Sequence, residues 1–226
     1  MADEKTWPRS PKPMWSVLRV LLVLAIVIQL ALIIAPAYEL WRGFLTEEIM
    51  AEDLTALAIA LAGGVVALVW LAVFVLAVVC TCRITFRMMK NLDVLEAPGE
   101  RMSPTMAVVW YFIPIASLFL PYRGFKQIWR GTFELSESIP ASDGAVGPWW
   151  LFWILSNITS TLSFRLAMES GGMSEYGPIN FELYNMSLWI GIASSALGVL
   201  ACWFMLGAFG PVVRAQEDII RTRTFD

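Results

Sequence analysis

Histidine is absent from all 226 residues, so the side chain most used for acid–base catalysis and metal binding near neutral pH is missing. Cysteine occurs three times, in or beside apolar runs, and this odd number argues against a disulfide framework. Cys80 and Cys82 have the spacing of a soft-metal pair, but no further ligand lies near them in the sequence. We therefore assign these cysteines a structural role as small buried hydrophobes and expect no metal and no cofactor.

The chain also lacks an excess of charge of one sign, because its net charge is only −3. Such a charge gives no field that would attract nucleic acid. What is abundant is apolar: 58% of the residues are hydrophobic and the mean hydropathy is +0.66. Soluble domains average about 45–50%. A single chain of this length cannot bury such an excess, so the composition indicates an integral membrane protein.

Four apolar stretches are long enough to cross a bilayer, which takes about 20 residues each. They are residues 17–37, 54–80, 149–166 and 183–209. The apolar part of the first exceeds the roughly 7–15 residues of a signal peptide, so we predict an uncleaved span. A fifth stretch, Met106 to Leu120, is shorter and contains Pro114, with Pro121 directly after it.

The distribution of Lys and Arg decides whether this fifth stretch spans, because short basic loops stay cytoplasmic. Five spans would divide the basic residues outside the helices seven to seven. Four spans, with the fifth stretch entering and leaving on the cytoplasmic side, leave only Arg42 outside. The cytoplasmic side then holds thirteen: Lys5, Arg9, Lys12, Arg83, Arg87, Lys90, Arg101, Arg123, Lys126, Arg130, Arg214, Arg221 and Arg223. We predict four spans with both termini cytoplasmic.

Residues 104–121 are therefore predicted to form a re-entrant segment that is broken at Pro114, since proline removes a backbone donor and clashes with the preceding turn. Pro98-Gly99 should end the preceding helix near Glu96, and Ser103 before Pro104 should start a new one. Non-helical backbone at membrane depth needs shielding by protein or water. We therefore expect the four spans to wrap this segment as the centre of the fold.

Residues 121–131 have the pattern of an amphipathic helix lying at the membrane interface. One face holds Tyr122, Phe125, Ile128 and Trp129, and the other holds Arg123, Lys126, Gln127 and Arg130. Membrane anchoring is the simpler interpretation of this helix, and a lipid-specific or partner-docking site is the more specific one. The candidates for that site are Tyr122, Arg123, Lys126, Trp129 and Arg130. Residues 132–147 are predicted to be a cytoplasmic loop and residues 214–226 a frayed helix end.

The third span carries a row of polar residues: Ser156, Asn157, Thr159, Ser160, Thr161 and Ser163. Such residues most often bond across helices or to their own backbone, and a substrate path is the alternative. Small residues four apart predict close helix contacts at Ala60 with Gly64, and on the last span at Gly191 with Ser195 and Ser194 with Gly198.

The stretch from about Arg83 to Leu166 resembles the domain of unknown function 4328 family of bacterial membrane proteins. The residues that carry the resemblance are Lys90-Asn-Leu92, Ser103-Pro104, Trp110-Tyr-Phe-Ile-Pro-Ile-Ala-Ser-Leu-Phe-Leu-Pro-Tyr122, Ile128-Trp-Arg130 and Trp149-Trp150. The family often has asparagine at the position of Ser117, so a donor–acceptor role there would be weakened but not abolished. The resemblance implies a bacterial cytoplasmic membrane and no defined activity.

These patterns predict a single all-α membrane domain over residues 1–226, with membrane lipids and other membrane subunits as partners. The favoured function is a non-catalytic accessory or structural subunit of a membrane complex. The alternative is a small transporter or lipid-handling protein that uses the Pro114 break and polar residues of the third span, Asn157 and Ser160. An enzyme using Glu100, Arg101, Arg123 and Arg130 around a phosphate headgroup is the weakest hypothesis, because these residues form no defined constellation.

Overall fold

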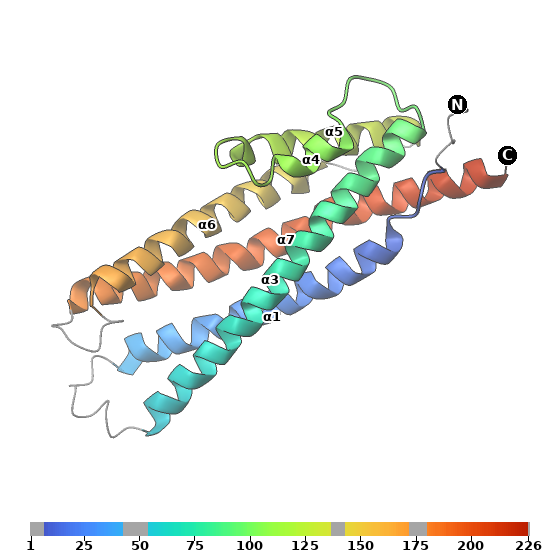
Figure 1. The fold of residues 1–226 in the computed structure, drawn as a ribbon. Coiled ribbons are helices and arrows are strands. Elements are labelled where there is room, and N and C mark those ends of the chain that lie inside the picture. The colour runs from blue at the N-terminus through green and yellow to red at the C-terminus, as the bar shows by residue number, and fades with distance from the viewer. Residues whose placement is uncertain (1–6, 43–53, 137–142, 172–179, 226) are drawn as a thin grey trace. The chain divides into compact units, whose positions relative to one another are not determined.

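A computed structural model of the protein describes residues 7–42, 54–136, 143–171 and 180–225. Every regular element among these residues is helical (Figure 1). Four helices are long: α1 Lys12–Arg42, α3 Leu54–Val94, α6 Val146–Glu169 and α7 Phe181–Phe225. The shorter elements are α4 Pro104–Val109, η1 Ala116–Leu118, α5 Leu120–Leu135 and η2 Asp143–Ala145.

Three of the long helices are apolar enough over enough residues to cross a membrane: Lys12–Trp41, Leu61–Val94 and Phe181–Arg223. The prediction of an all-helical membrane protein is thereby confirmed. The third predicted span is also a helix, α6, but its polar row and Arg165 make it less apolar than the other three. At a rise of about 1.5 Å per residue, its 24 residues are still about as long as a bilayer core is thick.

The helix ends around the broken segment lie where the sequence places them. Helix α3 ends at Val94, and Glu96 and Gly99 follow with positive φ angles of 53° and 89°, which turn the chain back. The Ser103 side chain accepts a hydrogen bond from Met106 N at 3.3 Å and so caps α4, which begins at Pro104.

The C-terminal tail differs from its prediction, because residues 214–225 continue α7 rather than fray. Gln216 and Ile219 of this part are buried on the same face of the helix as Val212 and Val213, which directly precede it. The packing of Ile219 and the hydrogen bonds of Gln216 hold the tail in place, and its charged residues occupy the other faces.

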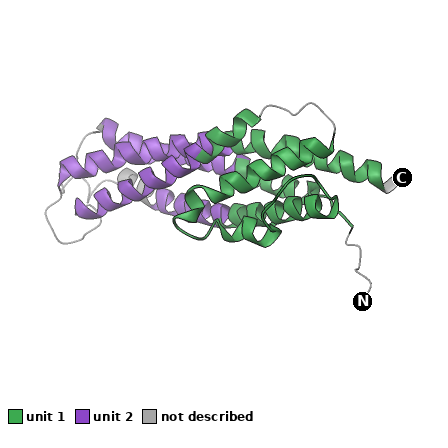
Figure 2. Cartoon of the chain, turned by 90° about the horizontal axis from the view of Figure 1, so that it is seen from above, with its two compact units in different colours: residues 1–22, 75–150, 203–226 green, residues 23–74, 151–202 purple. Residues whose placement is uncertain are grey.

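The chain divides into two compact units, and each of the four long helices contributes to both (Figure 2). Unit 1 comprises residues 1–22, 75–150 and 203–226, and unit 2 comprises residues 23–74 and 151–202. Fourteen of the sixteen Lys and Arg residues belong to unit 1, and the two exceptions are Arg42 and Arg165. The folding of the chain thus sorts its positive charge almost completely into one unit.

Candidate functional site

The broken segment contains the turn that the sequence predicts at Pro114. Helix α4 ends at Val109, since Pro114 has no N–H to donate to the carbonyl of Trp110. Local hydrogen bonds then hold the chain: Tyr111 N donates to Val108 O at 3.1 Å, Phe112 N to Val109 O at 3.0 Å, and Ser117 N to Ile113 O at 2.7 Å. Ser117 also donates its hydroxyl to Pro114 O at 2.8 Å, so this serine closes the turn.

The tip of the broken segment, residues 112–119, is apolar and exposed. Ile115 is 80% exposed, Phe112 66% and Phe119 64%. The expectation that the other helices wrap this segment is therefore wrong for its tip. The physical reason is that the turns and the Ser117 hydroxyl satisfy several of its backbone groups locally, which reduces the need for a protein cover.

A tryptophan fastens the tip to the start of α6. Trp150 Nε1 donates to Leu118 O at 2.9 Å, and the Trp150 ring meets the Tyr111 ring edge-on with centroids 6.1 Å apart. Pro121 is buried in the first turn of α5, directly after the tip. The tip is thus held at both of its ends while its apolar side chains face outward.

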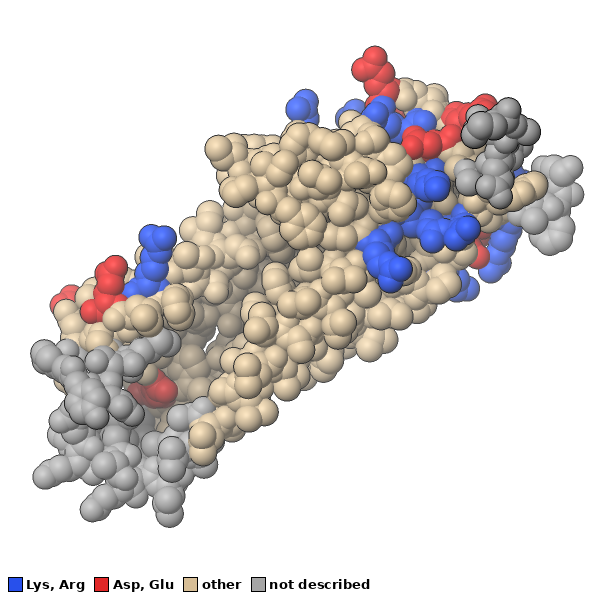
Figure 3. All heavy atoms as spheres, viewed as in Figure 1, with Lys and Arg blue, Asp and Glu red and all other residues tan. Residues whose placement is uncertain are grey.

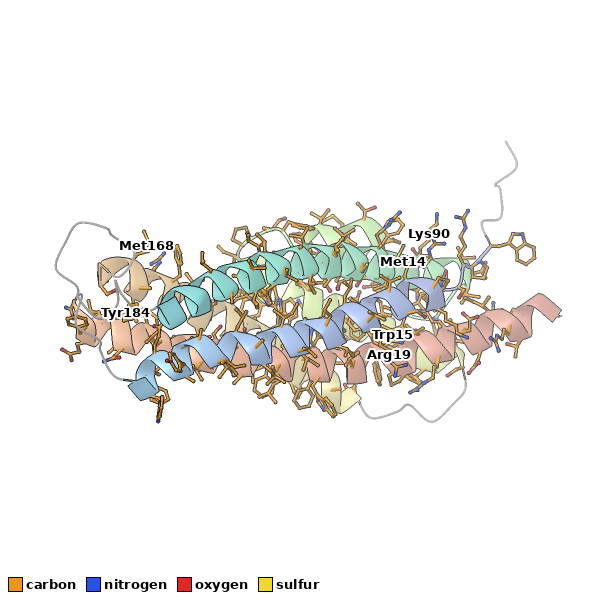
Figure 4. All side chains as sticks on the ribbon, turned by 90° about the horizontal axis from the view of Figure 1, so that it is seen from below. Met14, Trp15, Arg19, Lys90, Met168 and Tyr184 are labelled. Atoms are coloured by element: carbon orange, nitrogen blue, oxygen red, sulfur yellow. The ribbon has the colours of Figure 1, made fainter. Side chains whose placement is uncertain are left out.

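The apolar face of α5 packs into an aromatic cluster of unit 1. The Phe125 ring stacks on Phe209 of α7 at 4.3 Å and meets Trp149 of α6 edge-on at 5.4 Å. Trp15 of α1, which Figure 4 labels, stacks on the same Phe209 with the ring centroids 6.2 Å apart. Trp129 is only 4% exposed, so protein covers most of the face that the sequence assigns to lipid or a partner. The interfacial position of α5 stays a prediction.

The basic face of α5 remains at the surface, where Lys and Arg gather over unit 1 (Figure 3). Arg123 and Arg130 are exposed. Lys126 Nζ lies 3.3 Å from Asp143 Oδ2 and 5.3 Å from the centroid of the Tyr122 ring. Tyr122 and then Asp143 raise the pKa of Lys126, so it stays charged at neutral pH. Of the five candidates for this helix, four reach the surface and Trp129 does not.

Unit 1 also contains a buried polar network that sequence reasoning missed. Gln216 Nε2 donates to Thr132 Oγ1 at 3.0 Å and to Met88 O at 3.2 Å, and Gln216 Oε1 accepts from Asn91 Nδ2 at 3.1 Å. The Asn91 side chain also exchanges two 3.0 Å hydrogen bonds with the backbone of Arg9. The available signal was the helical spacing of the apolar residues around Gln216 in the tail.

Arg101, a member of the enzyme hypothesis, is used to cap α3. Its guanidinium donates to the carbonyls of Ala97, Pro98, Gly99 and Leu92. Its Nε lies 3.6 Å from Asp93 Oδ1. These contacts satisfy carbonyls at the helix end, as a basic side chain near a helix C-terminus commonly does. The guanidinium is therefore committed to the fold, whereas Glu100 beside it is exposed.

The polar row of α6 divides into two faces in unit 2. Ser156 and Ser194 of α7 each donate a hydroxyl to the other's carbonyl at 3.0 Å, and Ser163 donates to Ser187 O at 2.8 Å. Asn157, Ser160 and Thr161 are exposed instead. Two of the predicted polar residues therefore join helices, and the exposed ones leave α6 facing away from the rest of the unit.

Small residues bring α7 close to its neighbours in unit 2. A Cβ atom at Gly191 would lie 3.2 Å from Ser163 Oγ, and one at Gly198 would collide with the amide of Gln29 on α1. The predicted close contacts of α7 are confirmed at these two glycines. No pattern in the sequence marks Gln29, which is 9% exposed, as part of this contact. A Cβ at Gly64 of α3 would meet nothing within 4 Å, and the side chain of Ala60 lies outside the described residues.

Comparisons with known proteins support the resemblance found in the sequence. The model of the domain of unknown function 4328 family matches residues 48–209, which is more than half of the chain. No curated protein and no solved structure matches it.

Proposed function

This chain belongs to the domain of unknown function 4328 family, and we propose that it is a non-catalytic accessory or structural subunit of a complex in the bacterial cytoplasmic membrane. In this proposal α1, α3, α6 and α7 all cross the bilayer. Residues 104–121 form a re-entrant segment, and residues 121–131 lie at the cytoplasmic interface. The protein acts by packing against lipid and the helices of partner proteins.

The hydrogen bonds between α6 and α7 support a fourth crossing. Ser156 lies opposite Ser194, and Ser163 lies opposite Ser187, so the two helices run antiparallel and side by side (Figure 1). Both α7 residues belong to a helix that is apolar enough to span. A helix bonded to a spanning helix at two levels, seven residues apart, lies at the same depth.

The charge of the two units supports cytoplasmic termini. Unit 1 holds the start of α1, the end of α7 and fourteen of the sixteen basic residues, whereas unit 2 holds the end of α1 and the start of α7. Lys and Arg are retained on the cytoplasmic side of a membrane. An even number of crossings with unit 1 inside fits this distribution, and five crossings do not.

The observation that carries the accessory function is the exposed polar face of α6. Asn157, Ser160 and Thr161 stand at the depth of the α6–α7 hydrogen bonds and face outward. Lipid tails offer no partner to polar groups, whereas neighbouring transmembrane helices bind through such residues. The most apolar stretch of α3 has few buried residues as well, 11% against 39% for that of α7. These surfaces suit contacts with other helices.

The test is to isolate the tagged chain from bacterial membranes in a mild detergent after cross-linking in the intact membrane. We expect another membrane protein to purify with it at a fixed ratio, and native mass spectrometry to measure that ratio. If the tagged chain is recovered without any other membrane protein, both with and without cross-linking, the proposal is contradicted.

The alternative, a small transporter or lipid-handling protein, has less support. A substrate path in this hypothesis runs along Asn157 and Ser160, but these side chains face away from the helices of their own unit. Flux or lipid transfer in proteoliposomes tests it directly. Activity that disappears in Pro114→Ala and Asn157→Leu would favour it over the accessory role.

A further inference from the structure

We propose that the exposed face of α6 binds a second copy of this chain, so that two α6 helices pair in parallel about a two-fold axis along the membrane normal. The inference rests on the proposed membrane crossing of α6 and deepens the proposed function by naming one partner. The pairing surface is made by Asn157, Thr161, Phe164 and Met168, and is called the α6 seam below.

The spacing of the α6 seam is that of a helix-pairing surface. Its members follow at intervals of four, three and four residues, the repeat by which two helices wrap around each other with a left-handed supercoil. All four side chains are exposed, with Phe164 at 58% and Met168 at 53%. Crossing angles of about 20°, which this repeat produces, are also the commonest in membrane bundles.

Asn157 supplies the polar group that lipid cannot satisfy. Its Nδ2 donates to Trp153 O at 2.6 Å, and within the described residues its Oδ1 accepts no hydrogen bond. Thr161 behaves differently, because its hydroxyl donates to Asn157 O at 2.9 Å and is satisfied within its own helix. The cost of the unpaired amide oxygen in hydrocarbon is removed when a donor of another helix reaches it.

A second copy fits this seam better than an unrelated helix does. Two copies insert with the same orientation, so their α6 helices are parallel and their Asn157 residues lie at the same depth. An amide both donates and accepts, and two Asn157 side chains can therefore bond reciprocally across a two-fold axis. A single asparagine in such a seam fixes the register and the number of chains in coiled coils.

The flanks of the α6 seam are compatible with self-pairing. Ser160 and Arg165 border it on opposite sides and are five residues apart, the separation at which flanking residues of parallel paired helices face each other. Both side chains are exposed. The Ser160 hydroxyl of one copy can accept a hydrogen bond from the Arg165 guanidinium of the other, so the arginines need not oppose each other.

Disulfide trapping in native membranes tests the geometry. Cys80, Cys82 and Cys202 are first replaced by serine, and Thr161→Cys or Ser163→Cys is then introduced into the full chain. Thr161 lies on the α6 seam, whereas Ser163 points to α7 and donates to Ser187 O. We expect mild oxidation to cross-link Thr161→Cys between copies at least about tenfold more than Ser163→Cys, because a disulfide needs Cα atoms within about 7 Å.

The role of the amide is tested by dilution of the purified chain in detergent, with mass measured by light scattering. Asn157→Leu should weaken dimerisation by about tenfold or more, and Asn157→Gln should restore part of the loss. Ala193→Leu, at an exposed position of α7, is the control and should leave dimerisation unchanged. Equal cross-linking at residues 161 and 163, or a dimer that Asn157→Leu does not weaken, would overturn the proposal.

The outcomes separate this inference from the accessory function. If the chain purifies as a dimer without any other membrane protein, this result supports the α6 seam and contradicts the accessory role. Cross-linking of Thr161→Cys to a different protein, with no link between copies, supports the accessory role and overturns self-pairing. A monomer in membranes and in detergent overturns both.

Discussion

Gln216 is completely buried where α7 meets α3 and α5, and its amide makes three hydrogen bonds there. A buried amide is stable only when its partners are in place, since an unsatisfied donor or acceptor costs about 1–3 kcal/mol. The network holds four separate stretches of chain together without using any charge.

Replacing Gln216 by leucine should destabilise the protein by about 2–4 kcal/mol, because Thr132 and Met88 O each lose the hydrogen bond from Gln216 and Asn91 keeps only its bonds to Arg9. Equilibrium unfolding in mixed detergent micelles measures the loss. Thr222→Val on the exposed part of α7 is the matched control and should cost less than about 0.5 kcal/mol. Equal effects of the two substitutions would contradict the role of the network.

The contact between Gly198 and Gln29 gives a second prediction for single residues. Gly198→Ala should cost about 1–3 kcal/mol, since the added methyl displaces the Gln29 amide from a close helix contact. In a Gln29→Ala background the same change should cost at least about 1 kcal/mol less. Unfolding of the two single variants and the double variant provides the measurement, and additive effects would show that the two residues do not interact.

At the scale of elements, the broken segment and α5 are fixed together and end in the apolar tip. The tip is fixed by Trp150, and α5 is fixed by the aromatic cluster around Phe125. The prolines were visible in the sequence, because proline acts on its own backbone. The burial of Phe125 and Trp129 was not, because an amphipathic pattern is the same whether lipid or protein covers the apolar face.

Trp150→Phe should loosen the tip while leaving the helices intact. The variant keeps the ring but leaves Leu118 O without its donor, at a cost of about 1 kcal/mol. We expect faster hydrogen exchange at residues 116–119, measured by mass spectrometry in detergent. Trp203→Phe, a change at a 68% exposed position of α7, serves as the control. Unchanged exchange in Trp150→Phe would mean that the indole does not hold the tip.

At the scale of the whole molecule, the distribution of charge predicts one orientation in the membrane. Unit 1 carries nearly all basic residues, so its surface should face the cytoplasm. Arg123 and Arg130 test this directly, because five crossings would place both on the outer side.

In a chain without native cysteines, Arg123→Cys and Arg130→Cys should react with a membrane-impermeant maleimide only from the cytoplasmic side. Trp41→Cys, at an 82% exposed position of unit 2, should react only from outside and shows that the reagent works. The ratio of labelling in inside-out and right-side-out vesicles is the measurement. Labelling of either arginine position from outside would exclude the four-span arrangement.

The sequence by itself determined the membrane class, the helical content, the break at Pro114 and the sorting of positive charge. Each of these follows from composition or from residues close together in the chain, where propensity and hydropathy act locally. It did not reveal the network around Gln216 or the contact of Gln29 with Gly198. Both join residues more than 80 positions apart, and no local pattern marks which distant side chains will meet.

Only the tertiary structure decided which face of α6 is occupied. In the sequence Ser156 and Asn157 are neighbours in one polar row, with the same interpretation for both. Packing against α7 gives Ser156 a partner and leaves Asn157 exposed, because adjacent residues of a helix point about 100° apart. The tertiary structure therefore separates the polar groups that hold this chain together from those that are available to another chain.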